Sequence, residues 1–441
     1  MNVRELTLSL LCDFENSGKY VNLSLSSHLA DKLTAEDRGF LTALLYTSVE
    51  RKITYDYYVG AISERSLDKI DPTTLNMLRI GLCQIIDMDN IPDYAAVDET
   101  VRLGRNHGER SFVNGVLRKA VRLKNEDKLP LPKREKNLAR FLSVAYSYPL
   151  WIVKHFIALF GEENAERLLS HYNTVRYTDL TVNLTKISRD DYLGMLTEAG
   201  YTATASEYSS MSVRLDSSVN PRRLPGFDEG LFFVQDCASA ISAQALGAAG
   251  KDRVIDVCSC PGGKSFAAAI LAGGECEVLS LDIHESKLSL VIDGAQRLGL
   301  SCITVAEQDA THLSEECIEG FDKVICDVPC SGLGVLAKKP DIRYKDNQSL
   351  QNLPDIQLDI LRTSSRYVKD GGVIIYSTCT LNPKENEDVV REFLIENTSF
   401  TLVPFTAGTL ASDDGMLTLV PYESNTDGFF IAKLKKEKNN D

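Results

Sequence analysis

The second half of the chain alternates short runs of Val and Ile with longer helical patterns, and this alternation most constrains the fold. The apolar runs are Val254–Val257, Val278–Leu281, Ile303–Ala306, Lys323–Cys326 and Val373–Tyr376. Apolar residues at helical spacing fill 264–271, 285–298 and 355–369. Strands that alternate with helices are typical of a parallel sheet covered by helices on both faces. We therefore predict an α/β domain at 231–435, followed by a polar tail at 436–441.

The N-terminal part of the chain instead carries apolar residues at helical spacing. Examples are the sets Leu41, Leu44, Leu45, Val49 and Leu75, Leu78, Ile80, Cys83. Asp71 followed by Pro72 supplies the capping residue and the proline that commonly open a helix. We predict an all-α domain at 1–128.

One segment of the chain has a charge opposite to that of the whole. The protein carries a formal charge of −14, yet residues 101–140 contain twelve Lys and Arg against four acidic residues. A solvated helix face and a phosphate-facing surface both explain such a segment. Pro130 and Pro132 mark a linker within it. Residues 129–230 combine this linker with a small α+β module, in which we expect helices at 150–159 and 162–171 and a strand near 180–183.

Composition excludes several classes of protein. With 44% hydrophobic and 25% charged residues, the chain is neither collagen-like nor wholly disordered. No apolar run approaches the roughly 18 residues of a membrane helix. The 11 cysteines include no Cys-x-x-Cys pair, and only 6 histidines are present. These features favour a cytoplasmic protein without a disulfide scaffold or a structural metal.

A glycine turn follows the first predicted strand, at Asp256–Ser265. Glycines there let a ligand approach the backbone, and the next helix offers free N–H groups. A P-loop would require glycine at position 258, which is Cys. Asp282 ends the second strand and suits ribose hydroxyls, while Asp309 follows the third and could meet an adenine amino group. Each acid alone could be a helix cap, but together they indicate an adenosine pocket at the carboxyl edge of the sheet.

Two cysteines follow neighbouring strands of the predicted sheet. Cys330 lies in Asp327-Val-Pro-Cys-Ser-Gly332, and Cys379 lies in Ser377-Thr-Cys-Thr380. A buried cysteine is more often inert than reactive. Inert packing does not explain why both loops meet at the ligand edge of the sheet.

Six stretches carry a resemblance to a known family: Val234–Ser239, Pro261–Lys264, Asp327–Gly332, Lys339–Asp341, Thr378–Glu387 and Asp427–Phe430. On these, residues 232–435 resemble the Sun/Nop family of RNA cytosine-5 methyltransferases. Residues 37–118 resemble the NusB RNA-binding helical domain, through Leu78–Gly81, Ile91–Glu99 and Phe112–Arg118. The combination is similar to the bacterial 16S rRNA (cytosine-5)-methyltransferases of the Sun/RsmB type.

The resemblance implies a multidomain fold: an all-α NusB-like domain, a small α+β RNA-binding module, and a Rossmann-like class I methyltransferase domain. It implies S-adenosyl-L-methionine as cofactor, bound by Cys258, Ser259, Cys260, Pro261, Gly262, Gly263, Lys264, Asp282, Asp309 and Asp327. It implies no metal. The expected partner is 16S ribosomal RNA with a single-stranded or flipped cytosine, within the small ribosomal subunit or its precursor. We expect a monomer that does not bind membranes.

The resemblance also assigns catalytic roles to Cys379, Cys330, Asp327 and Lys264. Cys379 is the nucleophile on carbon 6 of the base, and Cys330 assists loss of the carbon 5 proton and release of the RNA. Asp327 hydrogen-bonds the ring nitrogen. Lys264 either lowers the pKa of the Cys379 thiol or orients Asp327.

Some residues depart from the family pattern, and other functions stay open. Ser259 and Cys260 replace two alanines of the glycine turn, and Thr181 replaces an arginine that contacts RNA. A DNA cytosine methyltransferase would place its nucleophile in the Pro-Cys loop. A ribosome assembly or antitermination factor would use the methyltransferase domain only as a scaffold.

Overall fold

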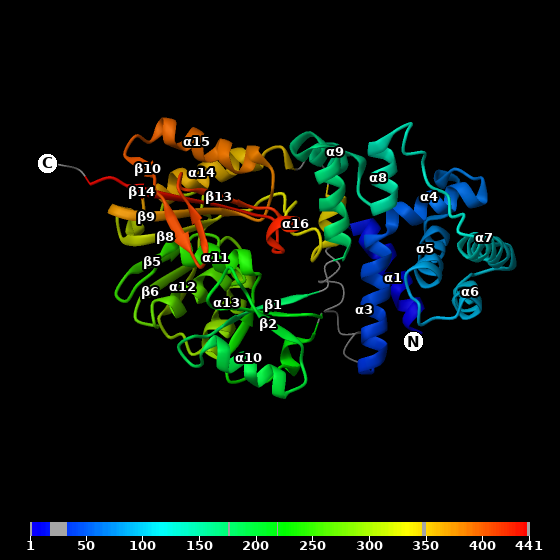
Figure 1. The fold of residues 1–441 in the computed structure, drawn as a ribbon, viewed down its shortest axis with the longest axis horizontal. Coiled ribbons are helices and arrows are strands. Elements are labelled where there is room, and N and C mark those ends of the chain that lie inside the picture. The colour runs from blue at the N-terminus through cyan, green and yellow to red at the C-terminus, as the bar shows by residue number, and fades with distance from the viewer. Residues whose placement is uncertain (1, 18–32, 175–176, 218, 346–349, 439–441) are drawn as a thin grey trace. The chain divides into compact units, whose positions relative to one another are not determined.

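The computed structural model describes residues 2–17, 33–174, 177–217, 219–345 and 350–438. The chain forms two compact units, one of residues 1–173 and 338–345, the other of residues 174–337 and 346–441 (Figure 1). The domain borders expected at 128/129 and 230/231 stay predictions. Residues 439–441 of the expected polar tail lie outside the described residues.

The first unit is built from helices. They are α1 (Val3–Ser17), α3 (Ala35–Glu50), α4 (Lys52–Ser63), α5 (Pro72–Ile86), α6 (Asp93–Arg102), α7 (His107–Asn125), α8 (Leu138–Tyr146) and α9 (Leu150–Thr174). The start of α5 is as predicted, because the Asp71 carboxylate accepts a hydrogen bond from the Thr74 N–H at 3.1 Å. Gly161, with φ of 78°, interrupts α9 between the two helices expected there.

A short segment from the second half of the sequence completes the helical unit. Residues 338–345 contain a 3₁₀ turn, Pro340–Tyr344. The Arg343 side chain is fully buried, stacks 3.9 Å above the Tyr148 ring and donates to the backbone oxygen of Glu50 at 3.2 Å. A buried guanidinium is tolerated only when acceptors surround it, so this segment is an integral part of the unit.

The second unit contains a small antiparallel sheet with strand order β2-β3-β1-β4. Its elements are β1 (Thr178–Val182), α10 (Arg189–Glu198), β2 (Ala203–Ala205), β3 (Ser212–Leu215) and β4 (Phe232–Val234). Thr181 is fully buried and donates to the Gln235 side chain at 2.9 Å. The residue that stands in place of the family's arginine therefore packs inside the module.

The larger sheet of the second unit has the order β10-β14-β9-β8-β5-β6-β7, with β13 paired to β14. Its strands are β5 (Arg253–Asp256), β6 (Glu277–Asp282), β7 (Ile303–Glu307), β8 (Phe321–Asp327), β9 (Val368–Thr378), β10 (Phe400–Leu402), β13 (Met416–Leu419) and β14 (Phe429–Lys436). The main helices are α11 (Cys237–Leu246), α12 (Gly263–Leu271), α13 (Glu285–Leu298), α14 (Leu353–Ser365) and α15 (Glu387–Glu396). All five predicted strands are present and pair in parallel.

Three sequence-based expectations for this region were wrong. The sheet is mixed, because β14 pairs antiparallel with β9 and with β10. Lys436, the first residue of the expected tail, ends β14. The helix expected at 355–369 ends at Ser365, and β9 begins at Val368. Hydrophobic periodicity does not separate a helix from a buried strand when only two residues lie between them.

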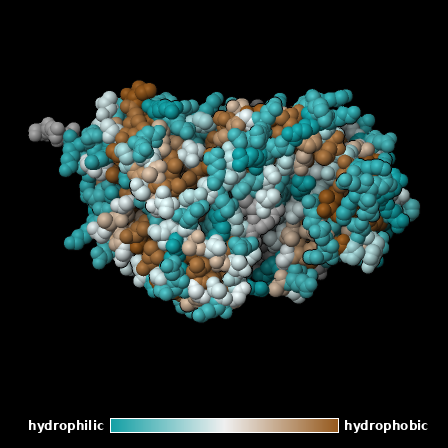
Figure 2. Space-filling model, in the orientation of Figure 1, coloured by the Kyte–Doolittle hydropathy of each residue, from teal (hydrophilic) through white to brown (hydrophobic). Residues whose placement is uncertain are grey.

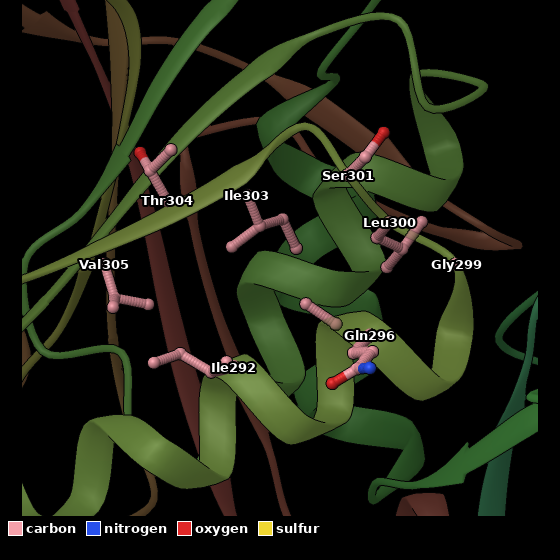
Figure 3. A pocket seen from close by; sticks show the side chains of 9 residues that line it. Ile292, Gln296, Gly299, Leu300, Ser301, Ile303, Thr304 and Val305 are labelled. Atoms are coloured by element: carbon pink, nitrogen blue, oxygen red, sulfur yellow. The ribbon is translucent and has the colours of Figure 1, made fainter.

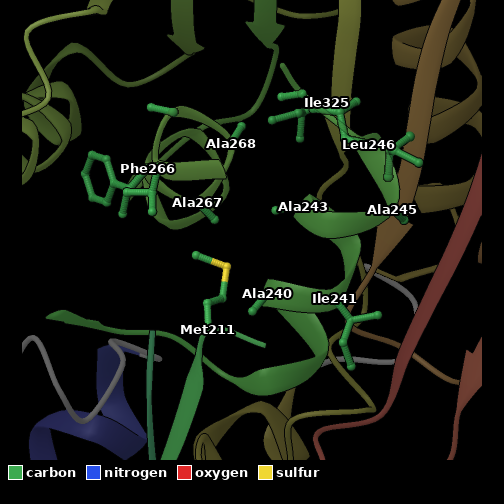
Figure 4. Packing of buried hydrophobic residues seen from close by; sticks show 14 of the residues in the cluster. Met211, Ala240, Ile241, Ala243, Ala245, Leu246, Phe266, Ala267, Ala268 and Ile325 are labelled. Atoms are coloured by element: carbon green, nitrogen blue, oxygen red, sulfur yellow. The ribbon is translucent and has the colours of Figure 1, made fainter. Parts of the chain in front are cut away.

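Small residues bring α11 and α12 close to the sheet. Figure 4 shows Ala240 and Ala243 of α11 with Ala267 and Ala268 of α12 in one buried cluster, together with Ile325 of β8. Alanines permit close approach of the helix backbones, and dense packing restricts their movement. The core therefore fixes the first turn of α12, where the glycine turn ends.

The surface in Figure 2 is mostly hydrophilic, with hydrophobic residues in separate groups. Within the part of the chain that the structure describes, no helix has the length and apolar character needed to span a membrane.

Candidate active site

The carboxyl edge of the large sheet collects the predicted site residues. β5 leads into the glycine turn and α12, and β6 ends at Asp282. Asp327 ends β8, and Cys379 directly follows β9. Because parallel strands present their carboxyl ends at one edge, residues more than 120 positions apart in sequence lie in one site.

The glycine turn brings its backbone directly to the start of α12. Gly262 has φ of +106°, and a Cβ there would collide with the Phe266 ring. No side chain caps the start of α12, so its first N–H groups remain available to an anionic ligand. Asp256 is buried, and its Oδ1 has no hydrogen-bond partner among the described residues. These features fit a ligand that brings a carboxylate and a hydrogen-bond donor to this turn.

Lys264 and Asp327 form a close ion pair beside this turn. The Lys264 Nζ lies 2.7 Å from Asp327 Oδ2, and the Ser377 hydroxyl donates to Asp327 Oδ1 at 2.7 Å. The Lys264 ammonium also lies 5.1 Å from the centre of the Phe429 ring. The contact places the Lys264 ammonium on Asp327, and both roles expected for Lys264 stay predictions.

The two cysteines meet at the same edge. Cys330 Sγ and Cys379 Sγ are 3.3 Å apart. The hydrogen bond to Cys379 is the main cause that raises the pKa of the Cys330 thiol, and burial and the charges of Glu385 and Asp327 add to it. The Cys330 thiol therefore keeps its proton at neutral pH, and either sulfur of the pair can donate the hydrogen bond between them.

The acids of the expected adenosine pocket also order their own loops. Asp282 Oδ2 accepts from the Cys260 N–H at 3.2 Å, and Oδ1 accepts from the His284 N–H at 3.0 Å. Asp309 Oδ1 accepts from the Thr311 N–H and hydroxyl, which lowers the Asp309 pKa. Both carboxylates thus act as loop caps and remain near the carboxyl ends of β6 and β7.

The remaining residues of the turn include two cysteines. Burial raises the pKa of the Cys258 thiol, and burial with the Asp282 charge raises that of Cys260 to about 12. The Ser259 N–H donates to the Leu281 backbone oxygen at 2.8 Å, and Pro261 follows Cys260 in the turn. Both thiols are therefore neutral, and the small replacements at 259 and 260 fit without changing the charge of the turn.

Three contributors to the site were missed in the sequence. Ser377 and Phe429 hold the Lys264–Asp327 pair, and Glu385 contacts the loop of Cys330. The signal for Ser377 and Glu385 was their place beside Cys379 in one motif. Phe429 lies in the matching stretch Asp427–Phe430, but its place at the site depends on the pairing of β14 with β9.

A cavity of about 600 Å³ lies elsewhere, between α13 and β7. Figure 3 shows its lining, which includes Ile292, Gln296 and Leu300 beside Ile303 and Val305 of β7. None of its lining residues belongs to the predicted site. The convergence of charged groups and thiols at the carboxyl edge therefore defines the candidate active site better than cavity size does.

The raised pKa of the buried Asp256 carboxyl should make the free energy of unfolding depend on pH. Burial raises its pKa from 3.8 to about 7. The folded state thus binds the proton more tightly than the unfolded chain, and stability is lost as pH rises from about 4 to 7. For this shift the loss is roughly 4 kcal/mol. Urea unfolding measures the free energy of unfolding at pH 5 and at pH 8. Its decrease between the two pH values should be smaller for Asp256→Asn than for the wild type, whereas equal decreases would contradict this role of Asp256.

Three family models match the chain. The 16S rRNA methyltransferase RsmB/F model matches residues 243–435, and the NusB family model matches residues 1–122. The ferredoxin-like domain model of the RsmF/B-like methyltransferases matches residues 148–221. With the sheet and the glycine turn, these matches define the class of the protein: it is an rRNA methyltransferase.

Curated relatives extend the match over the whole chain. The probable ribosomal RNA small subunit methyltransferases B of Synechocystis sp. and Bacillus subtilis are each 33% identical, over 99% of this chain and 100% and 99% of their own length. The ribosomal RNA small subunit methyltransferase B of Escherichia fergusonii is 30% identical, over 93% of both chains. The chain belongs to the RsmB family of 16S rRNA methyltransferases.

Solved structures share the fold. The crystal structure of PH0851 has a TM-score of 0.79 at 23% identity and covers 99% of this chain and 98% of its own. The structure of NSun6 from Pyrococcus horikoshii with SFG has a TM-score of 0.60 at 21% identity and covers 67% of this chain and all of its own.

Proposed function

We propose that this enzyme methylates carbon 5 of one cytosine in 16S ribosomal RNA through a covalent bond between Cys379 and carbon 6 of the base. The observation that supports this most is the 3.3 Å approach of Cys330 Sγ and Cys379 Sγ beside the Lys264–Asp327 pair. One thiol can bond the pyrimidine ring while the other assists its release.

The cofactor of the proposal is S-adenosyl-L-methionine, which when bound supplies an electrophilic methyl group on a sulfonium. The residues proposed to hold it are the glycine turn Cys258–Lys264, Asp282 for the ribose, Asp309 for the adenine, and Asp327. The uncapped start of α12 and the unpartnered Asp256 oxygen support this position.

Carbon 5 of cytosine is too poor a nucleophile to accept a methyl group unaided. The Cys379 thiolate adds to carbon 6, and the electron pair displaced by the new S–C bond makes carbon 5 nucleophilic. Asp327, oriented by Lys264 and Ser377, shares a proton with the ring nitrogen and stabilises the charge that develops there.

Release reverses the addition. Once deprotonated, Cys330 takes the carbon 5 proton, and the electrons of that C–H bond form the carbon 5–carbon 6 double bond. The S–C bond breaks, and its electron pair returns to Cys379 as a thiolate. One proton per turnover passes to solvent, which balances the conversion of the sulfonium to a neutral thioether.

The RNA must present an unstacked cytosine, so the substrate is a single-stranded or flipped nucleotide in free 16S rRNA or in an assembling small subunit. Ten of the twelve basic residues in 101–140 are exposed, which favours a phosphate-facing surface on the NusB-like region. We propose that the protein is a cytoplasmic monomer with a NusB-like domain at 1–128, an RNA-binding module at 129–230 and the methyltransferase domain at 231–435.

Methyl transfer to 16S rRNA transcribed in vitro, with labelled cofactor, tests the proposal. We expect one labelled position, and nuclease digestion should identify it as 5-methylcytidine. The same assay with a precursor of the small subunit shows whether free 16S rRNA or RNA in an assembling subunit is the better substrate. Label on another base or on another atom of cytosine would refute the chemistry, and cofactor and RNA binding without transfer would favour the scaffold function.

A further inference from the structure

A buried carboxylate that takes no part in the proposed chemistry contacts the loop of Cys330. Glu385, which ends a 3₁₀ turn (Pro383–Glu385), is 1% exposed. Its Oε2 accepts hydrogen bonds from the Ser331 N–H at 2.8 Å and from Gln357 Nε2 at 3.1 Å. Its Oε1 accepts from Asn382 Nδ2 at 2.9 Å. Ser331 directly follows Cys330, so this carboxylate restrains the backbone that carries one of the two thiols.

The other side of Cys330 is held by the same network. Gln357, on α14, is fully buried, and its Nε2 also donates to the Pro329 backbone oxygen at 2.9 Å. The residues before and after Cys330 are therefore both tied to Glu385, one directly and one through Gln357. A loop fixed at two adjacent positions has little freedom to move its side chain.

The network also reaches the loop of Cys379. The hydroxyls of Ser331 and Thr380 are 2.7 Å apart, and both residues are buried. The Gly334 N–H donates to the Cys379 backbone oxygen at 3.0 Å. The Tyr376 hydroxyl, on β9, donates to the Glu385 backbone oxygen at 2.6 Å. The residues that follow the two cysteines, Ser331 and Thr380, therefore contact each other. Glu385 is also bonded to β9, the strand that leads to Cys379.

A carboxylate is well suited to this position, because it accepts several hydrogen bonds at once and a buried one is stable only when its oxygens are satisfied. The Ser331 N–H and the side-chain amides of Gln357 and Asn382 provide these hydrogen bonds. Its charge also contributes to the raised pKa of the Cys330 thiol, after the hydrogen bond to Cys379 and burial.

We propose that Glu385 is a positioning residue that holds Cys330 beside Cys379, and that losing it slows release of the methylated RNA more than formation of the covalent adduct. The inference rests on the proposed function, since it assigns release to Cys330. It adds a residue, with Gln357 as its partner, that acts through the thiol loop without touching the base.

The test compares Glu385→Ala with Cys330→Ala and the wild type, with in vitro 16S rRNA and S-adenosylmethionine. Turnover of Glu385→Ala should fall about 10- to 100-fold, as expected for a misplaced catalytic group. A protein–RNA band that survives denaturing electrophoresis should accumulate, as for Cys330→Ala. Glu385→Gln keeps an acceptor for the Ser331 N–H, and Asn382 can rotate its amide to accept from the new NH₂ group, so its turnover should stay within about fivefold of the wild type.

Two further variants complete the design. Gln357→Met keeps the length of the side chain but removes its hydrogen-bond donor. This variant should also accumulate the covalent protein–RNA complex, with a smaller loss of turnover than Glu385→Ala. It provides the test if Glu385→Ala fails to fold. Asp388→Asn removes an exposed carboxylate three residues along the chain, with 58% side-chain exposure, and should match the wild type. Thermal melting verifies that each variant is folded.

The outcomes separate this inference from the proposed function. If the wild type forms no 5-methylcytidine, or Cys330→Ala traps no RNA, the proposed function itself fails. If both behave as expected but folded Glu385→Ala or Gln357→Met loses adduct formation and turnover in equal proportion, only the positioning role is overturned. A Glu385→Gln variant as impaired as Glu385→Ala would also overturn it, because the acceptor geometry would then be irrelevant.

Discussion

Replacing Cys379 with alanine is expected to abolish methyl transfer to RNA, because the proposed mechanism assigns the bond to carbon 6 to this thiol and release to Cys330. Replacing Cys330 with alanine should leave that bond able to form and impair its breakage. The Cys330→Ala protein should therefore accumulate as a covalent RNA complex, visible as a shifted band on a denaturing gel. The 3.3 Å separation of the two sulfur atoms places both within reach of one base.

A matched control is Cys302→Ala, which removes a partly exposed thiol in the loop before β7, away from the carboxyl edge of the sheet. Its turnover should stay within about twofold of the wild type, as for most substitutions outside a site. The opposite pattern, with Cys379→Ala trapping RNA and Cys330→Ala unable to form the adduct, would exchange the roles of the two cysteines. That exchange is the arrangement expected of a DNA cytosine methyltransferase.

Replacing Asp327 with asparagine is expected to lower the rate of a single methylation turnover by about 10²- to 10³-fold, the range seen when one preorganised hydrogen-bonding group is removed. The change removes the charge that pairs with Lys264 at 2.7 Å, and the Lys264 side chain, 10% exposed, is left in the site without its partner. Single-turnover measurement with saturating RNA and cofactor isolates the chemical step from product release.

Asp322 provides a control on the same strand. It lies toward the amino end of β8 and pairs with Lys369 at 2.8 Å, with side chains 35% and 40% exposed. Asp322→Asn should change the rate less than twofold, because an exposed ion pair contributes little. An Asp327→Asn enzyme that keeps the wild-type rate but needs more cofactor would show that Asp327 binds the cofactor and takes no part in the chemical step.

Much of the candidate site could be predicted because its residues follow strands. The alternation of apolar runs with helices predicts parallel strands, and these present their carboxyl ends at one edge. Asp327 and Cys379 could therefore be placed together although 52 positions of sequence separate them. The start of α5 could also be predicted, since the capping residue Asp71 and the proline at position 72 act on adjacent residues.

Contacts that depend on nonlocal pairing could not be predicted in this way. The sequence alone determined the helices of the N-terminal region, the parallel strands and the edge at which the thiols meet, because each follows from local periodicity and strand direction. Only the tertiary structure decided that Lys264 pairs with Asp327, that β14 inserts antiparallel beside β9, and that Glu385 restrains Cys330. Each of these depends on where a side chain or strand finds a partner far along the chain, and packing around them selects that partner.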